Sequence, residues 1–223
     1  MSNGQGGAEQ RLVTPGEALG SSSGLRNGTG VINKDGELIA TKLGFTKILN
    51  NTISISPTHS AYMPQSGDYI IGHVVEVRSN LWFIDIRGPF QGLLPMSLAP
   101  WKVEYGESRK HMNIGDALFA RVQEVDESHN VVLTMKGVGL RKIAEGAIHR
   151  FPIHLIEGFT GSNSSNLHLL REATNCRIIA TDNGYLWFDG DKDSMAVLRD
   201  KLATLEQFVS TEQMTTQLKS IIG

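Results

Sequence analysis

The sequence predicts a mixed β and α+β protein with a small N-terminal β domain, a five-stranded OB-type barrel and a C-terminal α/β module. Three observations lead to this prediction. The N-terminal quarter consists of short apolar runs between turns rich in Gly, Asn and Pro. Residues 66–137 alternate apolar and polar side chains, as half-buried strands do. Beyond residue 150, apolar residues also recur at helical spacing.

The N-terminal domain is expected at residues 11–65. It contains the apolar runs "GVIN", "ELIATKLGF" and "TISIS", each bounded by turn residues. Within "NKDGEL", Asp35-Gly36 predicts a hairpin turn, because both residue types tolerate a positive φ. Residues 1–10 lack the apolar core of a signal peptide and are predicted to be a disordered lead.

The barrel is expected at residues 66–145. Trp82, Ile84 and Ile86 share one face of a predicted strand, so we expect Trp82 in the barrel core. Phe83 and Asp85 lie on the other face of the same strand. A long loop, "MSLAPWKVEYGESRKHMN", follows the third strand, and two more strands flank the turn "DESHN". Five short strands with one long loop are typical of an OB-type barrel.

The α/β module is expected at residues 146–223, after a connector at 138–150. "FPIHLI" is predicted to be a strand, followed by a helix in "SSNLHLLREAT", the strands "CRIIAT" and "YLWFDG", and two further helices. Asp191 or Asp193 can cap the first of these two helices. Asn183-Gly184 predicts a tight turn between the strands. Trp187 alternates with Tyr185, and this pattern leaves its face undecided.

Composition excludes several classes of protein. A net charge of -2 argues against coating of nucleic acid by bulk charge. The single cysteine, Cys176, excludes a disulfide framework and a CxxC zinc site, and we expect it to be a small buried residue. No apolar run reaches the length of a membrane span, and we expect a cytoplasmic protein.

An enzyme in its own right is a further hypothesis, but the sequence gives it little support. Asp189, Asp191 and Asp193 form the one dense acidic set, and capping at a helix start explains them. The histidines have no spacing that suggests a metal site. We therefore expect no catalytic residues, no metal and no cofactor.

Residues 66–137 resemble the ribosomal-protein S-one RNA-binding repeat. The similarity rests on "GDYIIGHVVEV", "LWFIDI", "GLLPMS", "IGDALFARVQEVD" and "VVLTMK", in the order and spacing of that family. The resemblance implies single-stranded RNA held on one barrel face by aromatic and basic residues, with Phe83 as the platform aromatic. Asp126 also matches a family surface position. Pro95 and Asn130 replace a frequent His and Arg, so we expect weak binding by the isolated barrel.

Basic residues gather at two places in and after the barrel. Arg109, Lys110 and His111 lie in the long loop, where they can reach phosphates. Arg141 and Lys142 follow the last barrel strand. We expect these five residues to contact RNA; the alternative is ordinary charge on a solvated surface.

The last module resembles a KH domain, a family that places a GxxG turn before a helix to hold RNA phosphates. Aligned from "LHLLREATNC", the turn falls on Gly161, Ser162, Asn163 and Ser164, which keeps the first Gly and lacks the usual basic pair. The alternative register, 158–161, keeps both glycines but leaves three extra residues before the helix, and the turn is degenerate in either register. The first three of these residues are RNA-binding candidates. The turn's plainer role is to cap the helix through Ser164 or Ser165.

The chain combines, in this order, an N-terminal β domain with "VTPGE" at 13–17, an S-one repeat and a KH domain with a degenerate turn. This combination resembles the RNA-binding cap subunits of the exosome, of the archaeal-like ribosomal-RNA-processing protein four type. The resemblance implies a non-catalytic subunit that captures single-stranded, adenine-rich 3′ tails. It implies a hexameric phosphorolytic ring as partner, with three cap copies per complex, alone or mixed with a zinc-ribbon cap subunit. The alternative is a structural adaptor that stabilises the ring with little RNA contact.

Overall fold

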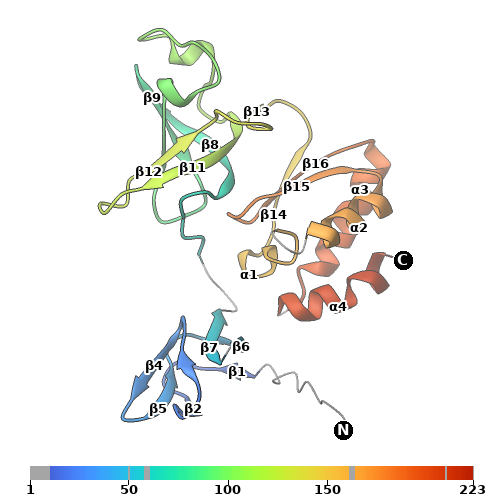
Figure 1. Cartoon of the computed structure of the whole chain (residues 1–223). Coiled ribbons are helices and arrows are strands. Elements are labelled where there is room, and N and C mark those ends of the chain that lie inside the picture. The colour runs from blue at the N-terminus through green and yellow to red at the C-terminus, as the bar shows by residue number, and fades with distance from the viewer. Residues whose placement is uncertain (1–10, 50, 58–60, 161–163, 209, 223) are drawn as a thin grey trace. The chain divides into compact units, whose positions relative to one another are not determined.

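The computed structural model describes residues 11–49, 51–57, 61–160, 164–208 and 210–222. The chain forms two compact units, Met1–Ser60 and Ala61–Gly223. The second unit contains both the barrel and the α/β module (Figure 1). Within the described part of the chain, no helix is long and apolar enough to cross a membrane.

The first unit consists of two small sheets. One has the order β1 (Leu12–Val13), β6 (Gly44–Leu49), β7 (Thr52–Pro57) and β3 (Arg26–Asn27). The other has the order β2 (Ala18–Ser21), β5 (Glu37–Ala40) and β4 (Val31–Lys34). The turn between β4 and β5 is the predicted one, with φ of 52° at Asp35 and 86° at Gly36. Buried aliphatic residues, among them Val13, Leu38 and Ile55, form the core of this unit.

The barrel predicted from the alternating pattern is confirmed. Its strands are β8 (Tyr69–Val77), β9 (Leu81–Asp85), β10 (Gly92–Pro95), β11 (Ala117–Val125) and β12 (Val131–Thr134). β12 pairs with both β10 and β11, which closes the five strands into a barrel. Trp82 is fully buried in the barrel core, as its position beside Ile84 and Ile86 predicted.

The α/β module packs helices on a three-stranded sheet. The sheet has the order β14 (Ala147–Arg150), β16 (Tyr185–Asp189) and β15 (Arg177–Ala180). The helices are α1 (Ile153–Ile156), α2 (Ser164–Thr174), α3 (Lys192–Leu205) and α4 (Thr211–Ile222). Asp191 caps α3 as predicted, since its carboxylate accepts hydrogen bonds from the N–H groups of Asp193 and Ser194. Cys176 is buried in the core of this module, also as predicted.

Two local predictions around residue 150 are wrong. The "FPIHLI" segment forms the helix α1 and not a strand. Pro152 precedes this helix with φ of -58°, and a proline at a helix start loses no backbone hydrogen bond because the first N–H groups have no helical partner. The connector at 138–150 contains β13 (Lys142–Ile143) and β14, which pair with β11 and β16 respectively.

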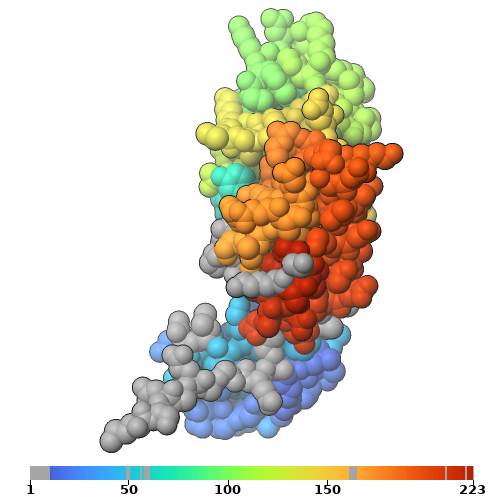
Figure 2. Space-filling view, turned by 90° about the vertical axis from the view of Figure 1, so that its right-hand side faces the viewer, coloured from blue at the N-terminus to red at the C-terminus, as the bar shows by residue number. Residues whose placement is uncertain are grey.

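Both faces of the β16 strand are buried, and the structure shows on which face Trp187 lies. Leu186 and Phe188 pack under the helices. Tyr185 and Trp187 point the other way and pack against Phe119 of the barrel. Figure 2 shows the orange residues of the module lying directly against the yellow residues that end the barrel.

Asn183 fastens the two halves of this unit together. Its side chain has no exposed surface. Its Nδ2 donates to the carbonyl oxygens of Ile71 (2.7 Å) and Ile86 (2.9 Å), and its Oδ1 accepts from the N–H of Ile71 (3.2 Å). Arg87 adds a second link, donating from Nη1 to the carbonyl oxygens of Phe151 (2.8 Å) and Gly184 (2.5 Å). The turn at Asn183-Gly184 therefore also connects the module to the barrel.

Candidate nucleic-acid interface

A hollow of about 410 Å³ lies between the β8–β9 turn and the long loop after β10. The loop is tied to the turn by two hydrogen bonds to the carbonyl oxygen of Ser79, from the N–H of Gly106 (3.0 Å) and from Oγ of the buried Ser108 (3.2 Å). Arg78, directly after β8, and Arg109, from the 3₁₀ helix Ser108–Lys110, both line the hollow. The fold thus brings two guanidinium groups to one concave surface.

Phe83, the predicted platform aromatic, is covered by Arg78. It lies on β9 and is partly buried. The guanidinium carbon of Arg78 stands 4.6 Å from the centre of its ring, and Nε of Arg78 donates to Glu76 at 2.7 Å. A guanidinium stacked on a ring keeps its second face and its outer N–H groups for a base or a phosphate. Arg78 is thus a candidate RNA contact that the motif comparison missed.

Arg109 and Lys110 are both exposed, as expected for phosphate-binding residues in a loop. Among the residues that the structure describes, the Arg109 guanidinium has no ion pair or hydrogen bond. Lys110 pairs with Glu107. An exposed pair of this kind contributes little stability, so a phosphate can compete for the ammonium group. Tyr105, also at the hollow, is 79% exposed and offers a ring for stacking.

His111 and Lys142 have structural partners. The ring of His111 stacks on that of Trp101, with centroids 5.3 Å apart. Nζ of Lys142 donates to the carbonyl oxygen of His111 (3.3 Å) and forms an ion pair with Asp116 (2.6 Å). Burial tends to raise the pKa of Asp116, but the bonds from Lys142 and from the Asn113 N–H outweigh this effect and lower it. Lys142 therefore fastens the loop to the barrel, and its charge is largely neutralised.

Arg141 belongs to the joint between barrel and module. Its guanidinium carbon is 5.1 Å from the ring centre of Phe119 and 5.2 Å from that of Trp187. One of its N–H groups donates to the carbonyl oxygen of Gly139 at 3.2 Å. The residue remains exposed, so it can still meet a phosphate, but at a different site from Arg109.

The turn after β11 shows what replaces the family's frequent arginine. Asn130 donates from its N–H (2.8 Å) and from Nδ2 (2.7 Å) to the carboxylate of Asp126. These bonds lower the pKa of Asp126, the side-chain bond contributing most. Asn130 thus closes the turn. Beside it, His129 stacks on Phe90 with ring centres 4.7 Å apart, an aromatic pair that sequence reasoning missed and that no local pattern signals.

The remaining candidates, Gly161, Ser162 and Asn163, lie outside the described residues. The α2 helix begins at Ser164, directly after them. The capping role expected of Ser164 stays a prediction, because the structure does not describe the side chain of this residue. Ser165 is exposed on the helix. The RNA role of this turn stays a prediction.

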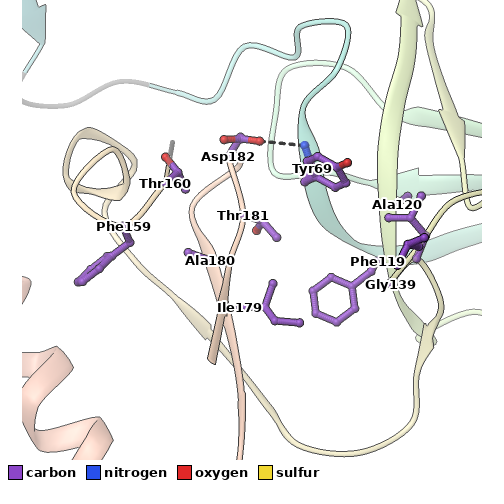
Figure 3. A pocket seen from close by; sticks show the side chains of 12 residues that line it. Tyr69, Phe119, Ala120, Gly139, Phe159, Thr160, Ile179, Ala180, Thr181 and Asp182 are labelled. Carbon is purple, nitrogen blue, oxygen red and sulfur yellow. Dashed lines mark hydrogen bonds between the residues drawn. The ribbon is translucent and has the colours of Figure 1, made fainter. Parts of the chain in front are cut away.

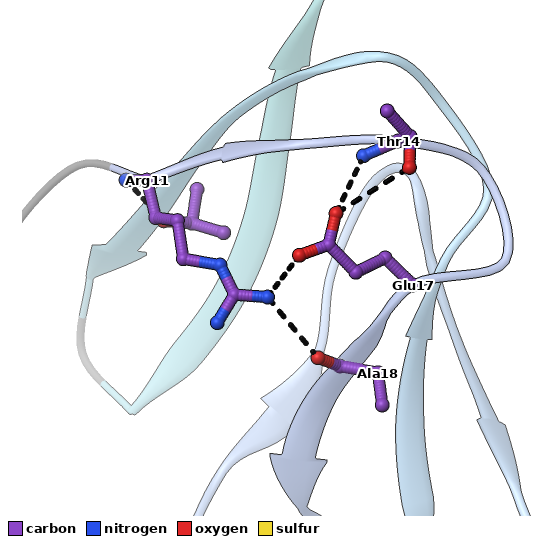
Figure 4. A network of polar contacts seen from close by, with 5 residues as sticks. Arg11, Thr14, Glu17 and Ala18 are labelled. Carbon is purple, nitrogen blue, oxygen red and sulfur yellow. Dashed lines mark hydrogen bonds and ion pairs between the residues drawn. The ribbon is translucent and has the colours of Figure 1, made fainter.

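The "VTPGE" segment folds into a compact polar network (Figure 4). Glu17 accepts hydrogen bonds from the N–H (3.0 Å) and the hydroxyl (3.4 Å) of Thr14 and pairs with Arg11. The Thr14 N–H, followed by Arg11, lowers the pKa of Glu17. The network holds the first turn of the unit against β2, where Arg11 also reaches the carbonyl oxygen of Ala18 at 3.5 Å.

The comparisons with known proteins agree with this architecture. Residues 61–113 match the family model "RRP4, S1 domain". An exosome complex component Rrp4 from Methanobrevibacter smithii is 32% identical over 209 residues, covering 94% of this chain and 70% of that protein. The chain belongs to the Rrp4 family.

Other relatives extend the Rrp4 assignment. The Rrp4 of Picrophilus torridus is 28% identical over 213 residues, covering 96% of this chain and 92% of its own. A crystal structure described as an exosome complex RNA-binding protein is 23% identical, with a TM-score of 0.61, and the match covers 73% of this chain and 97% of that one. At this identity the last comparison supports the fold alone.

Proposed function

We propose that this chain is a non-catalytic, RNA-binding cap subunit of a cytoplasmic exosome. It captures single-stranded, adenine-rich 3′ tails and guides them into a phosphorolytic ring for 3′-to-5′ decay and processing. The observation that carries the proposal is the hollow lined by Arg78 and Arg109 on the barrel of an Rrp4-family chain. Within the described residues no cluster of His, Cys, Asp or Glu could hold a metal ion, and the proposal assigns none.

Each domain of the chain has its own role in the proposed function. The N-terminal β domain at 11–65 docks on the hexameric ring, and its exposed apolar side chains supply contact area; these are Leu12, Ile32, Leu43 and Ile48. The S-one domain at 66–145 presents the hollow to RNA. The KH domain at 146–223 packs on the barrel through Asn183 and supports it.

Three copies per complex, alone or mixed with a zinc-ribbon cap subunit, make weak binding by one copy sufficient. Residues 66–150 carry ten Lys and Arg and ten Asp and Glu, so a single copy has no large positive surface. Binding of one strand by several neighbouring hollows raises the effective concentration and can increase affinity by roughly 10²–10⁴. The near-neutral charge is then compatible with RNA capture.

Charge-neutral substitution tests this proposal. The double variant Arg78→Gln with Arg109→Gln, assembled with the ring, is expected to weaken binding of an adenine-rich strand. The dependence of this binding on salt concentration should also become less steep, by about two phosphate contacts for each copy that touches the strand. The matched control is Lys192→Gln with Arg199→Gln, which removes two exposed positive charges from α3. If both double variants bind RNA like the unmodified complex, the hollow is not the RNA site.

A structural adaptor is the second candidate function. The engagement of Lys142 by Asp116 and of Lys110 by Glu107 favours it, because both cations already have partners. An adaptor predicts that the ring becomes more stable when the chain is added while its RNA affinity stays the same. Thermal melting of the ring with and without the chain, alongside RNA binding, separates the two functions.

A further inference from the structure

A second cavity, of about 350 Å³, lies at the joint between the barrel and the α/β module (Figure 3). The barrel side contributes Tyr69, Phe119 and Leu140, and the module contributes Thr160, Ile179 and Asp182. All of these residues belong to the same compact unit. The volume is near the lower end of the range for small-molecule sites, roughly 300–1,000 Å³.

The walls of this cavity suit a flat, aromatic ligand. Tyr69 is half exposed, and Phe119, Leu140 and Ile179 add apolar surface. Mostly apolar walls with a few polar groups are typical of sites that bind rings and read their edges. A nucleobase combines a ring face that stacks on aromatic side chains with an edge that forms hydrogen bonds.

Asp182 supplies the polar group that would read such an edge. One carboxylate oxygen, Oδ2, accepts the N–H of Tyr69 at 2.8 Å. In Figure 3 the second oxygen points away from Tyr69, toward Thr160. Burial raises the pKa of this carboxyl group, because its charged form loses contact with water. A hydrogen bond donated by a ligand would stabilise that charged form. A carboxylate oxygen accepts a hydrogen bond from an exocyclic amino group, whereas the N3–H of uracil lies between two carbonyl oxygens that the carboxylate repels.

Two arginines flank the aromatic walls. The guanidinium carbon of Arg121 is 5.8 Å from the ring centre of Tyr69, and that of Arg141 is 5.1 Å from the ring centre of Phe119. Both side chains are exposed. A base placed in the cavity would carry its phosphates toward the rim, where cations on both sides can bind them.

We propose that this cavity seats one unstacked RNA base that bears an exocyclic amino group, namely adenine, cytosine or guanine, and discriminates against uracil through Asp182. The inference rests on the proposed function, since it presumes that the chain meets RNA. It adds a second site, distinct from the hollow beside Arg109, and a base preference.

The test titrates the full-length, isotope-labelled chain with adenosine 5′-monophosphate and, separately, uridine 5′-monophosphate, following backbone amide NMR signals. Adenosine monophosphate is expected to shift the signals of residues at the cavity, Tyr69, Val138 and Asp182 among them, and to bind roughly fivefold or more tightly than uridine monophosphate. Equal affinity for the two nucleotides, or shifts that leave the cavity residues unmoved, would overturn the inference.

Asp182→Asn provides a sharper readout than loss of binding. The amide oxygen can keep the hydrogen bond from the Tyr69 N–H, which turns the NH₂ group toward the cavity. A donor in this place favours a carbonyl edge, so the preference should shift from adenosine toward uridine monophosphate. Asp200→Asn, which removes an exposed carboxylate on α3, is the matched control and should keep the original preference. An unchanged preference in Asp182→Asn would contradict the assignment.

Tyr69→Ala tests the stacking wall in the same way. Tyr69 is 51% exposed, so the fold should tolerate the loss of its ring, and adenosine monophosphate should bind at least about fivefold more weakly. This series can fail while the assembled complex still captures RNA through Arg78 and Arg109, which would refute the cavity alone. Conversely, nucleotide binding at the cavity without RNA capture by the complex would refute the proposed function alone.

Discussion

Replacement of Asn183 by alanine should loosen the joint between the barrel and the α/β module. The side chain is fully buried and serves three main-chain groups, the N–H and C=O of Ile71 and the C=O of Ile86. A buried group left without a partner costs about 1–3 kcal/mol. Water entering the vacated space would form hydrogen bonds with some of these three main-chain groups. We therefore expect a loss of about 3–4 kcal/mol in the free energy of unfolding.

Urea denaturation followed by tryptophan fluorescence measures this loss, because Trp187 packs at the same joint. Asn113→Ala is the control: it removes an exposed side chain with one hydrogen bond, to Arg109, and should cost less than about 0.5 kcal/mol. Asn183→Asp keeps the shape but turns an oxygen toward the two carbonyls, so it should destabilise at least as much as alanine. A loss below about 1 kcal/mol in both Asn183 variants would refute the reasoning.

Two more predictions concern neighbours of this joint. Gly184→Ala should lower the free energy of unfolding by roughly 1–3 kcal/mol. The backbone φ is 76°, and the new Cβ would stand 2.8 Å from Nη1 of Arg87 and 3.0 Å from the carbonyl oxygen of Phe151. A melting temperature equal to that of the wild type would contradict this prediction. Asp182→Asn should unfold at higher temperature than the wild type at pH 7, because burial raises the carboxyl pKa and ionisation therefore costs stability. This difference should shrink as the pH falls from the raised pKa of the folded state toward the ordinary aspartate value of 3.8, and it should vanish below that value, where the wild-type carboxyl is protonated in both states. A difference that is independent of pH would point to another cause.

Local patterns predicted most of the fold. Alternation placed Trp82 in the barrel core, because a strand with one buried face has period two. The Asp35-Gly36 turn and the Asp191 cap followed from backbone preferences of single residues. The strand predicted at 151–156 failed because a short apolar run fits a buried strand and a buried helix equally well.

Long-range features of the candidate site could not be read from the sequence. The partners of Asn183 are 97 and 112 positions away along the chain, and only folding brings them together. The covering of Phe83 by Arg78 depends on the side-chain rotamer of a residue that directly follows β8. The ion pair between Lys142 and Asp116 is also non-local, so basic clustering alone could not separate Lys142 from Arg109, which has no ion pair with any residue that the structure describes.

Fluorescence anisotropy of a labelled adenine-rich strand tests the central claim most directly. The strand is titrated with this chain alone, with the phosphorolytic ring alone and with the two assembled, each at two salt concentrations. Our account predicts weak binding by the chain alone and tight, salt-sensitive binding by the assembled complex, stronger than that of the bare ring. Equal affinity of the ring with and without this chain would contradict an RNA-capturing cap and leave the chain a structural adaptor.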